Sequence, residues 1–213
     1  GVFYKSDNHK FFDGDVEDFI GVACYGFPVG RSVVTSMFTE DLLENKNVLE
    51  LKRLFIHDGY GKNIESYVIS QSFKWLKEHS PDIKVLISYA DPEQAHDGCI
   101  YQATNWIYQG CGSFQLMPTY SLRLNEEDDW MHSRNVYSKY GSNNIDKMKK
   151  AIGHDFWLKR ETTKHRYIYF LGDKKENRKF RKVLKHPMME YPKNTEFIDE
   201  VIKVEVEDNK WKD

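Results

Sequence analysis

The chain has 213 residues, of which 40% are hydrophobic and 15% aromatic, so it can bury the core of one large domain or of two small ones. It has no run of about twenty apolar residues and no basic-then-apolar start, which excludes a membrane span and a secretory signal, and three cysteines without a CxxC spacing indicate free thiols in a reducing cytoplasm. The formal net charge of -2 hides a split: residues 132–193 hold seventeen Lys and Arg against six Asp and Glu, and the rest of the chain holds fourteen against twenty-seven.

Residues 2–4 and 19–27 have the composition of two strands joined by turn-forming residues. Residues 47–58 follow as a third strand with period-two alternation, which places Arg53 on the same face as Leu51 and Phe55. A guanidinium directed into an apolar face needs a partner. We expect that partner to be a carboxylate of the chain, Glu50 or Asp91, or else an anionic ligand or a substrate.

The sequence GYGKN (residues 59–63) separates this strand from a predicted helix over residues 63–79. Small residues and a helix N-terminus together can hold a phosphate, and Lys62 adds a charge. The spacing is neither that of a P-loop nor GxGxxG, so an ordinary strand–turn–helix junction explains it equally well. The apolar residues of the helix cover more than one stripe, which predicts burial on two sides.

Residues 83–90 (IKVLISYA) form a nearly continuous apolar strand of the kind found inside a sheet. Asp91 stands at its C-terminal end, where ligands gather in sheets with parallel pairing. A short helix is predicted over residues 97–104, with Asp97 as its N-cap. Tyr101 on this helix is either a general acid or a core tyrosine with a bonded hydroxyl. Strands are predicted at residues 106–109 and 118–124.

The C-terminal third reads as a polar helical stretch (133–153), a short strand (164–172), a basic helix (173–186), an extended tail (187–193) and an acidic peripheral end. Its excess of positive charge favours a polyanionic partner. The alternative is a solvated surface that is rich in charges.

Two runs, ELKRLFIHDGYGKN (50–63) and ISYADPEQAHDGCIYQATNWIYQG (87–110), resemble the Mom family of phage DNA-modification proteins. HSRNVYSKYG, KHRYIYFLGDKK and KHPMMEYPK extend the resemblance to about residues 2–193. It implies an α+β fold similar to the GNAT acyltransferases, with a central twisted mixed sheet that separates between the third strand and VLISYA. The implied domains are a catalytic domain (1–130), a basic extension that contacts DNA (131–193) and an acidic tail (194–213).

The resemblance implies an enzyme that adds a carbamoylmethyl group to the exocyclic amine of adenine in double-stranded DNA and so protects phage DNA from restriction. It implies acetyl-CoA or another activated acyl donor, iron as a possible metal, and the cytoplasm of an infected bacterium. The implied catalytic residues are Asp91, Tyr101 and Arg53. The implied donor-binding residues are Gly59, Gly61, Lys62, Asn63 and Ser66. The implied substrate and DNA contacts are Ser88, Tyr89, Trp106, Arg166, Arg178, Arg181 and Lys182.

Two features depart from the pattern of the superfamily. The loop fits the usual Q/R-x-x-G-x-G/A form only loosely, and the first strand and helices of such a domain, which wall the acceptor site, are expected ahead of Gly1. Two other functions therefore stay open. The chain is either a generic N-acyltransferase acting on a protein or a small amine, or a phage protein that binds DNA without chemistry.

Overall fold

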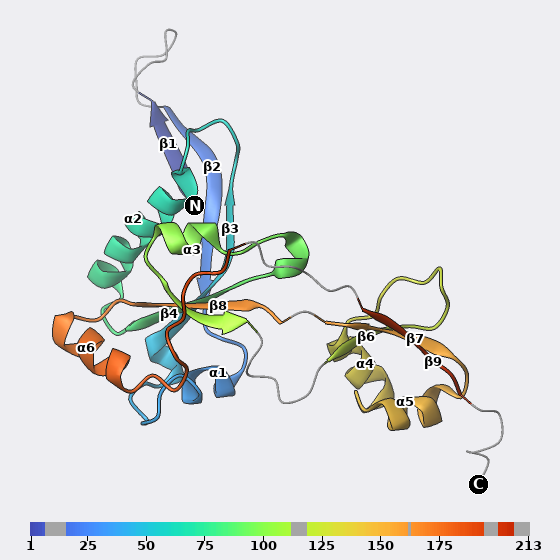
Figure 1. Ribbon diagram of the computed structural model, residues 1–213. Coiled ribbons are helices and arrows are strands. Elements are labelled where there is room, and N and C mark those ends of the chain that lie inside the picture. Colours follow the sequence, from blue (N-terminus) through green and yellow to red (C-terminus); the bar gives the residue numbers. More distant parts are fainter. Residues whose placement is uncertain (7–15, 112–118, 162, 194–199, 207–213) are drawn as a thin grey trace. The chain divides into compact units, whose positions relative to one another are not determined.

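The computed structural model describes residues 1–6, 16–111, 119–161, 163–193 and 200–206. The chain divides into two compact units, drawn in Figure 1. The first unit holds residues 1–91, 95–111 and 164–194, and the second holds residues 92–94, 112–163 and 195–213. No helix in these described ranges is both long and apolar enough to cross a membrane.

A six-stranded mixed sheet forms the centre of the first unit, so the predicted α+β class is confirmed. The strand order is β1-β2-β3-β4-β8-β5, and only β3 and β4 run parallel. The strands are β1 (Val2–Ser6), β2 (Val16–Gly26), β3 (Val48–Ile56), β4 (Val85–Ala90), β5 (Ile107–Cys111) and β8 (His165–Phe170). The strand β4 is buried along almost its whole length, as its continuous apolar sequence predicts.

The parallel pairing between β3 and β4 is short. It joins Val48–Glu50 to Val85–Ile87 and then ends, although β3 continues to Ile56. The separation expected between these two strands is therefore present. Beyond Glu50, the backbone groups of β3 that face β4 must find partners other than a neighbouring strand.

A β-bulge reverses the alternation of β3. The register shifts between Cys24, opposite Arg53, and Tyr25, opposite Leu51, so Lys52 is the extra residue. Because one inserted residue moves the following side chains to the other face, Arg53 leaves the face of Leu51. Leu51 is buried and Arg53 is exposed. The predicted placement of Arg53 in an apolar face is wrong for this reason.

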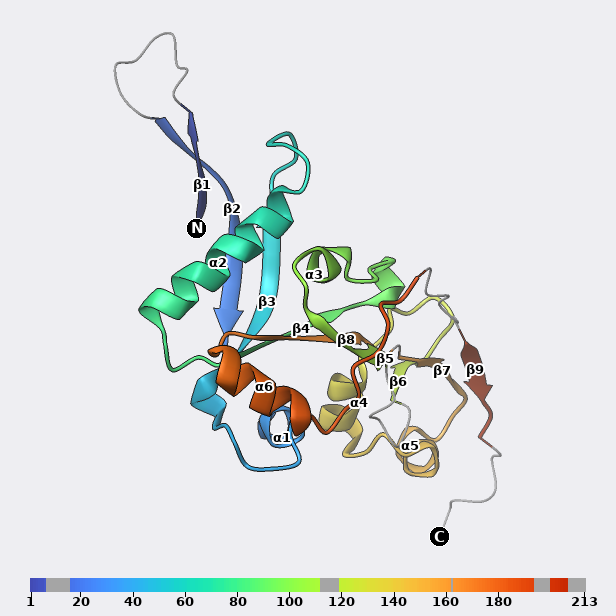
Figure 2. The ribbon, with the colours of Figure 1, turned by 60° about the vertical axis from the view of Figure 1, so that its left-hand side comes forward.

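One long helix, α2 (Ile64–His79), covers one face of the sheet and lies along β2 and β3 in Figures 1 and 2. Its residues Ile69, Phe73 and Leu76 pack into the main core cluster. Tyr67 and Trp75, on its other side, are exposed, so the predicted burial on two sides is wrong.

The remaining helices of the first unit are short. The helix α3 (Cys99–Ala103) precedes β5 on the α2 side. The opposite face is covered by α1 (Arg31–Thr35) and α6 (Lys174–Lys182), where Val34 and Phe180 join the second core cluster. Two short 3-10 turns span Asn45–Asn47 in the first unit and Pro92–Gln94, which belongs to the second.

The second unit contains a three-stranded antiparallel sheet, in the order β6-β7-β9, and two helices. Its elements are β6 (Tyr120–Arg123), β7 (Phe156–Arg160), β9 (Val201–Val204), α4 (Ser133–Tyr140) and α5 (Ile145–Ile152). The polar stretch predicted as helical is thus two helices, interrupted after Gly141, whose left-handed conformation ends α4. The acidic end supplies a strand, β9, that the sequence pattern did not predict.

This division differs from the predicted linear order of domains at residues 130 and 193. Residues 164–194 return to the first unit because β8 pairs with both β4 and β5. The basic residues counted in the C-terminal third are consequently distributed over both units, and α6 belongs to the unit with the six-stranded sheet.

Gly98→Ala tests the close packing before α3. Gly98 has φ +74°, and an added Cβ would lie 2.5 Å from the Tyr167 ring. We expect a loss of roughly 2–3 kcal/mol in the free energy of unfolding, measured by urea denaturation, from backbone strain plus the clash. Gly59→Ala is the control, because Gly59 also has positive φ but faces open space. Equal losses in both variants would contradict the proposed clash.

Candidate functional site

The gap between β3 and β4 is occupied by hydroxyl groups. The buried Ser88 hydroxyl donates to the Leu51 carbonyl oxygen at 2.9 Å and lies 2.7 Å from the Tyr101 hydroxyl. One hydroxyl carries one proton, so Ser88 donates either to Leu51, with Tyr101 then donating to Ser88, or to Tyr101, which leaves the phenol proton free for another acceptor. Ser88 thereby replaces the strand partner that β3 lacks at this point and fixes the hydroxyl end of Tyr101 inside the gap.

Burial raises the pKa of Tyr101, and the hydrogen bond with Ser88 opposes this effect. The phenol therefore keeps its proton at neutral pH. A protonated phenol in a protected position can donate a hydrogen bond or a proton to a group that enters the gap. Tyr101 is thus a core residue, with its ring centroid 5.0 Å from that of Tyr167, and also a hydrogen-bond donor in a fixed position.

A second pair of hydroxyls adjoins Tyr101. Tyr25 on β2 lies 2.6 Å from Ser72 on α2, and Ser72 donates to the Ile69 carbonyl, so Tyr25 is the donor between them. Burial, with a smaller contribution from nearby Tyr101, raises the pKa of Tyr25 to about 12. The sequence pattern did not single out Tyr25, because its distance from Tyr101 along the chain hides their proximity in the fold.

Asp91 follows the last residue of β4. Its carboxylate lies 3.1 Å from the Lys164 ammonium, and its backbone carbonyl accepts from His96. Asp91 is three residues beyond Ser88, so along an extended strand their Cα atoms are roughly 10 Å apart. A substrate that used both Asp91 and Tyr101 would extend along the strand end.

The GYGKN loop leads into a groove of about 520 Å³. Gly59 and Gly61 have positive φ with open space around their Cβ positions, and Asn63 is left-handed as the N-cap of α2. The residues that line the groove are Lys62, Asn63, Ile64, Ser66, Tyr67, Ser70 and Ala103. Three of the predicted donor-binding residues are therefore brought together here.

The groove offers an anion the N-terminus of α2 and the ammonium group of Lys62. Ser66 does not add a free donor, because its hydroxyl donates to the Asn63 carbonyl at 2.9 Å. Glu65 in the first turn brings a negative charge, which favours the helix but competes with a bound anion. The phosphate part of a donor fits this arrangement through the backbone and Lys62.

A second buried polar network lies beside α3. His165 on β8 is 1% exposed, with Nδ1 at 2.8 Å from the Tyr108 hydroxyl and Nε2 at 3.5 Å from the Asp97 carboxylate. A neutral ring with its proton on Nε2 satisfies both partners. The Tyr167 hydroxyl donates to the backbone carbonyl of Asp97, so the network ties the residue before α3 to the sheet.

The predicted role of Asp97 as a helix cap is wrong. Gly98 is the N-cap of α3, and no side chain caps it. The carboxylate of Asp97 pairs with His165 instead, a residue 68 positions away that no local pattern could supply. The available signal was a histidine and an arginine within the otherwise apolar strand HRYIYF.

The structure separates the predicted DNA contacts into buried and exposed residues. Trp106 and Arg166 are 1% and 5% exposed and belong to the interior, so they do not form a contact surface. Tyr89 is half-buried against the second core cluster. The exposed members are three residues of α6, Arg178, Arg181 and Lys182. Arg53 is also exposed, and among the described residues Asp91 forms its ion pair with Lys164 rather than with Arg53.

The described ranges contain no group of three or more His, Cys, Asp or Glu side chains arranged to hold a metal ion.

Comparison with known proteins places this geometry in context. A model of the Mom protein family matches residues 1–193. The methylcarbamoylase mom of Escherichia phage Mu is 27% identical over 185 residues, a match that covers 83% of this chain and 68% of that protein. The matched region contains Ser88, Asp91 and Tyr101 together with the GYGKN loop.

Ser88→Ala tests the bonding in the strand gap. The change leaves the Leu51 carbonyl and the Tyr101 hydroxyl without a buried partner, so we expect a loss of about 1–3 kcal/mol in the free energy of unfolding. Tyr101→Phe and the double variant complete a thermodynamic cycle measured in urea. The losses in the free energy of unfolding should be non-additive, because the two hydroxyls are hydrogen-bonded to each other. Strict additivity would show that the two hydroxyls act independently.

His165 predicts a loss of stability in mild acid. Burial lowers its pKa below the ordinary value of 6.5, with Asp97 opposing the shift. The unfolded chain therefore binds a proton before the folded chain does, and stability falls as the pH drops below about 6.5 through the folded pKa. Urea titrations between pH 7.5 and 5.5 should show this slope, and His165→Gln should reduce it. His186, whose pKa burial also lowers, accounts for a residual slope. An unchanged slope in His165→Gln would contradict the assignment.

Proposed function

The chain belongs to the Mom protein family, and on that premise we propose that it is a phage enzyme that modifies adenine in DNA by transferring a carbamoylmethyl-type group to N6. The observation that carries the proposal is the Tyr101 hydroxyl, bonded to Ser88 where the pairing of β3 and β4 ends, on the same helix as Ala103, which lines the groove at the N-terminus of α2. Such a modification protects phage DNA from restriction by altering the base that a nuclease reads.

In the proposed step, a bond forms between adenine N6 and the transferred carbon, and the bond between that carbon and its leaving group breaks. The amine loses one proton and the leaving group gains one. Adenine N6 is a poor nucleophile because its lone pair is delocalised into the ring, so the step depends on orientation and on proton transfer. Tyr101, which keeps its proton because burial raises its pKa, would protonate the leaving group.

Asp91 would accept the proton of the amine. Asp91 directly follows β4, with its Cα about 10 Å along the strand from that of Ser88, so a substrate that used both Asp91 and Tyr101 would extend along the strand end. Lys164, at 3.1 Å, holds the carboxylate by a charged contact and limits the orientations that Asp91 can take. Arg53, exposed on β3, would contact an anionic part of the substrate rather than a buried partner.

The donor would be an activated carrier of the carbamoylmethyl-type group rather than acetyl-CoA itself, because an acetyl group lacks the nitrogen that a carbamoylmethyl group contains. Gly59, Gly61, Lys62 and Asn63 would hold its phosphate-bearing part, through backbone N–H groups and one ammonium. Ser66 would line the groove without donating to the ligand, because its hydroxyl donates to the Asn63 carbonyl.

Double-stranded DNA would be the acceptor, and the target adenine must leave the stack before its amine can reach the strand gap. Exposed basic residues on α6 favour DNA over a small amine, because contacts to phosphate position a duplex without reading its sequence. Arg178, Arg181 and Lys182 lie on the exposed part of this helix, of which only Phe180 is buried.

Mass spectrometry of nucleosides from bacteria that express the chain tests the proposal. Wild type should yield a deoxyadenosine enlarged by the transferred group. Asp91→Asn and Tyr101→Phe should reduce it by about 10²–10⁴-fold, because each removes one proton-transfer group while preserving shape. Circular dichroism checks the fold of each variant. Unmodified DNA from folded wild-type protein, or full modification in both variants, would overturn the proposal.

Charge reversal of Arg178, Arg181 and Lys182 to Glu separates this function from a generic acyltransferase. A DNA-modifying enzyme should lose modification and lose the salt dependence of DNA binding. Activity on a protein or a small amine would be unaffected by the three changes. Tight, salt-dependent binding without any new nucleoside would instead identify a DNA-binding protein without chemistry.

A further inference from the structure

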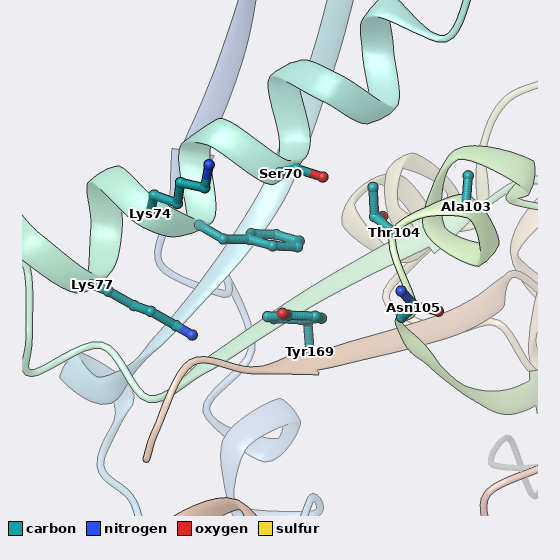
Figure 3. Close-up of a pocket in the computed structure, with 8 residues that line it drawn as sticks. Ser70, Lys74, Lys77, Ala103, Thr104, Asn105 and Tyr169 are labelled. Atoms are coloured by element: carbon teal, nitrogen blue, oxygen red, sulfur yellow. The ribbon is translucent and has the colours of Figure 1, made fainter. Parts of the chain in front are cut away.

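The short length of α3 leaves part of the α2 side of the sheet without a covering helix. The helix α2 has 16 residues, about 24 Å, whereas α3 has five, about 7.5 Å. A cavity of about 260 Å³ lies where α3 ends, between the C-terminal half of α2 and the turn that leads into β5. Figure 3 shows this cavity with the side chains around it.

We name this cavity the Tyr169 pocket, lined by Ser70, Phe73, Lys74, Lys77, Ala103, Thr104, Asn105 and Tyr169. The Phe73 and Tyr169 rings stack at 4.0 Å with an interplanar angle of 18° and form its inner wall. Lys77 extends from α2 towards the Tyr169 ring, and Asn105 lies across from it in Figure 3.

Four polar side chains that line the pocket have hydrogen-bond donors with no partner within the described parts of the protein. Within the described ranges, the side chains of Lys74, Lys77, Asn105 and Tyr169 make no hydrogen bond or ion pair. Burial raises the pKa of Tyr169, so its hydroxyl keeps a proton and can donate. Ser70 and Thr104 differ, because their hydroxyls already donate to backbone carbonyls.

The electrostatics of the pocket favour an anion. No Asp or Glu lines it, and Lys74 and Lys77 stand on the same side of α2 at a spacing of three residues. The two aromatic rings stack on each other, so each has one face covered by the other. Two exposed lysines, a phenol and an amide thus line one space.

From this geometry we propose that the Tyr169 pocket binds the phosphate of a nucleoside phosphate. Two lysines match the charge of a phosphate monoester, between about -1.5 and -2 at neutral pH. The volume exceeds what a lone phosphate needs but is below the roughly 300–1,000 Å³ of a pocket for a whole drug-sized ligand. It therefore holds a phosphate with its attached sugar, and the base extends outward.

The Tyr169 pocket continues into the groove at the N-terminus of α2. Ser70 and Ala103 line both spaces. Ser66, Ser70, Lys74 and Lys77 follow one another at helical spacing, so one edge of α2 borders both spaces over about 16 Å between Ser66 and Lys77. A nucleotide-bearing carrier of the transferred group would occupy both spaces. This identification of the ligand as the donor's carrier rests on the proposed function, whereas the binding of the phosphate does not.

Isothermal titration of the full chain with adenosine 5′-monophosphate and with adenosine tests the pocket. The nucleotide should bind at least tenfold more tightly than the nucleoside. Lys74→Gln/Lys77→Gln should abolish this difference, and Tyr169→Phe, which keeps the ring, should weaken nucleotide binding several-fold. Lys46→Gln/Lys139→Gln removes two exposed lysines elsewhere and should bind like wild type.

Competition then identifies the source of the phosphate. Displacement of the nucleotide by a five-nucleotide single-stranded DNA assigns the pocket to a nucleic-acid strand. Displacement by coenzyme A but not by the DNA assigns it to a small carrier. Either result supports a nucleoside-phosphate site. Equal binding of nucleotide and nucleoside, or unchanged nucleotide binding in the double lysine variant, overturns it. These measurements need no modified DNA, so their failure is distinct from a failure of the proposed transfer.

Discussion

The early end of the parallel pairing between β3 and β4 is the constraint on which the rest of the site depends. Only Val48–Glu50 and Val85–Ile87 form the parallel ladder, so beyond Glu50 the backbone groups of β3 on the β4 side lack a strand partner. A buried carbonyl without a partner costs about 1–3 kcal/mol, and the Ser88 hydroxyl supplies the missing bond to Leu51. The same hydroxyl is hydrogen-bonded to Tyr101, so the residue that satisfies the Leu51 carbonyl also fixes the position of the Tyr101 hydroxyl.

Polar networks on both sides of α3 hold this short helix in position. Tyr101 connects it to Ser88 in the strand gap, and Asp97, just before it, is tied to His165 and Tyr167 on β8. Such networks are costly when incomplete and rigid when every member is satisfied. A five-residue helix has little stability of its own. The hydrogen bonds to the sheet stabilise α3 in place of the additional helical turns that it lacks. The shortness of α3 also exposes the wall formed by Phe73 and Tyr169.

The distribution of charge relates to the fold rather than to position along the chain. Residues 164–194 return to the first unit, so α6 brings Arg178, Arg181 and Lys182 to the domain that carries Tyr101 and Asp91. The net charge of the C-terminal third correctly indicated many exposed cations, but it also counted Arg166, which the pairing of β8 buries. The net charge of a segment thus indicates the kind of partner it favours, whereas strand pairing decides which charged side chains are exposed and able to contact that partner.

The sequence by itself determined the α+β class, the strands β1 to β4, the helix α2 and the family, because alternation, apolar runs and turn residues are local signals. It also located the loop at Gly59–Asn63, whose residues partly line a groove. Only the tertiary structure decided the orientation of Arg53, since one bulge at Lys52 reverses a face, and the partner of Asp97, since His165 reaches it through strand pairing. Likewise, Tyr25, Ser88 and Tyr169 acquire their surroundings from segments far apart in the chain, which no local pattern encodes.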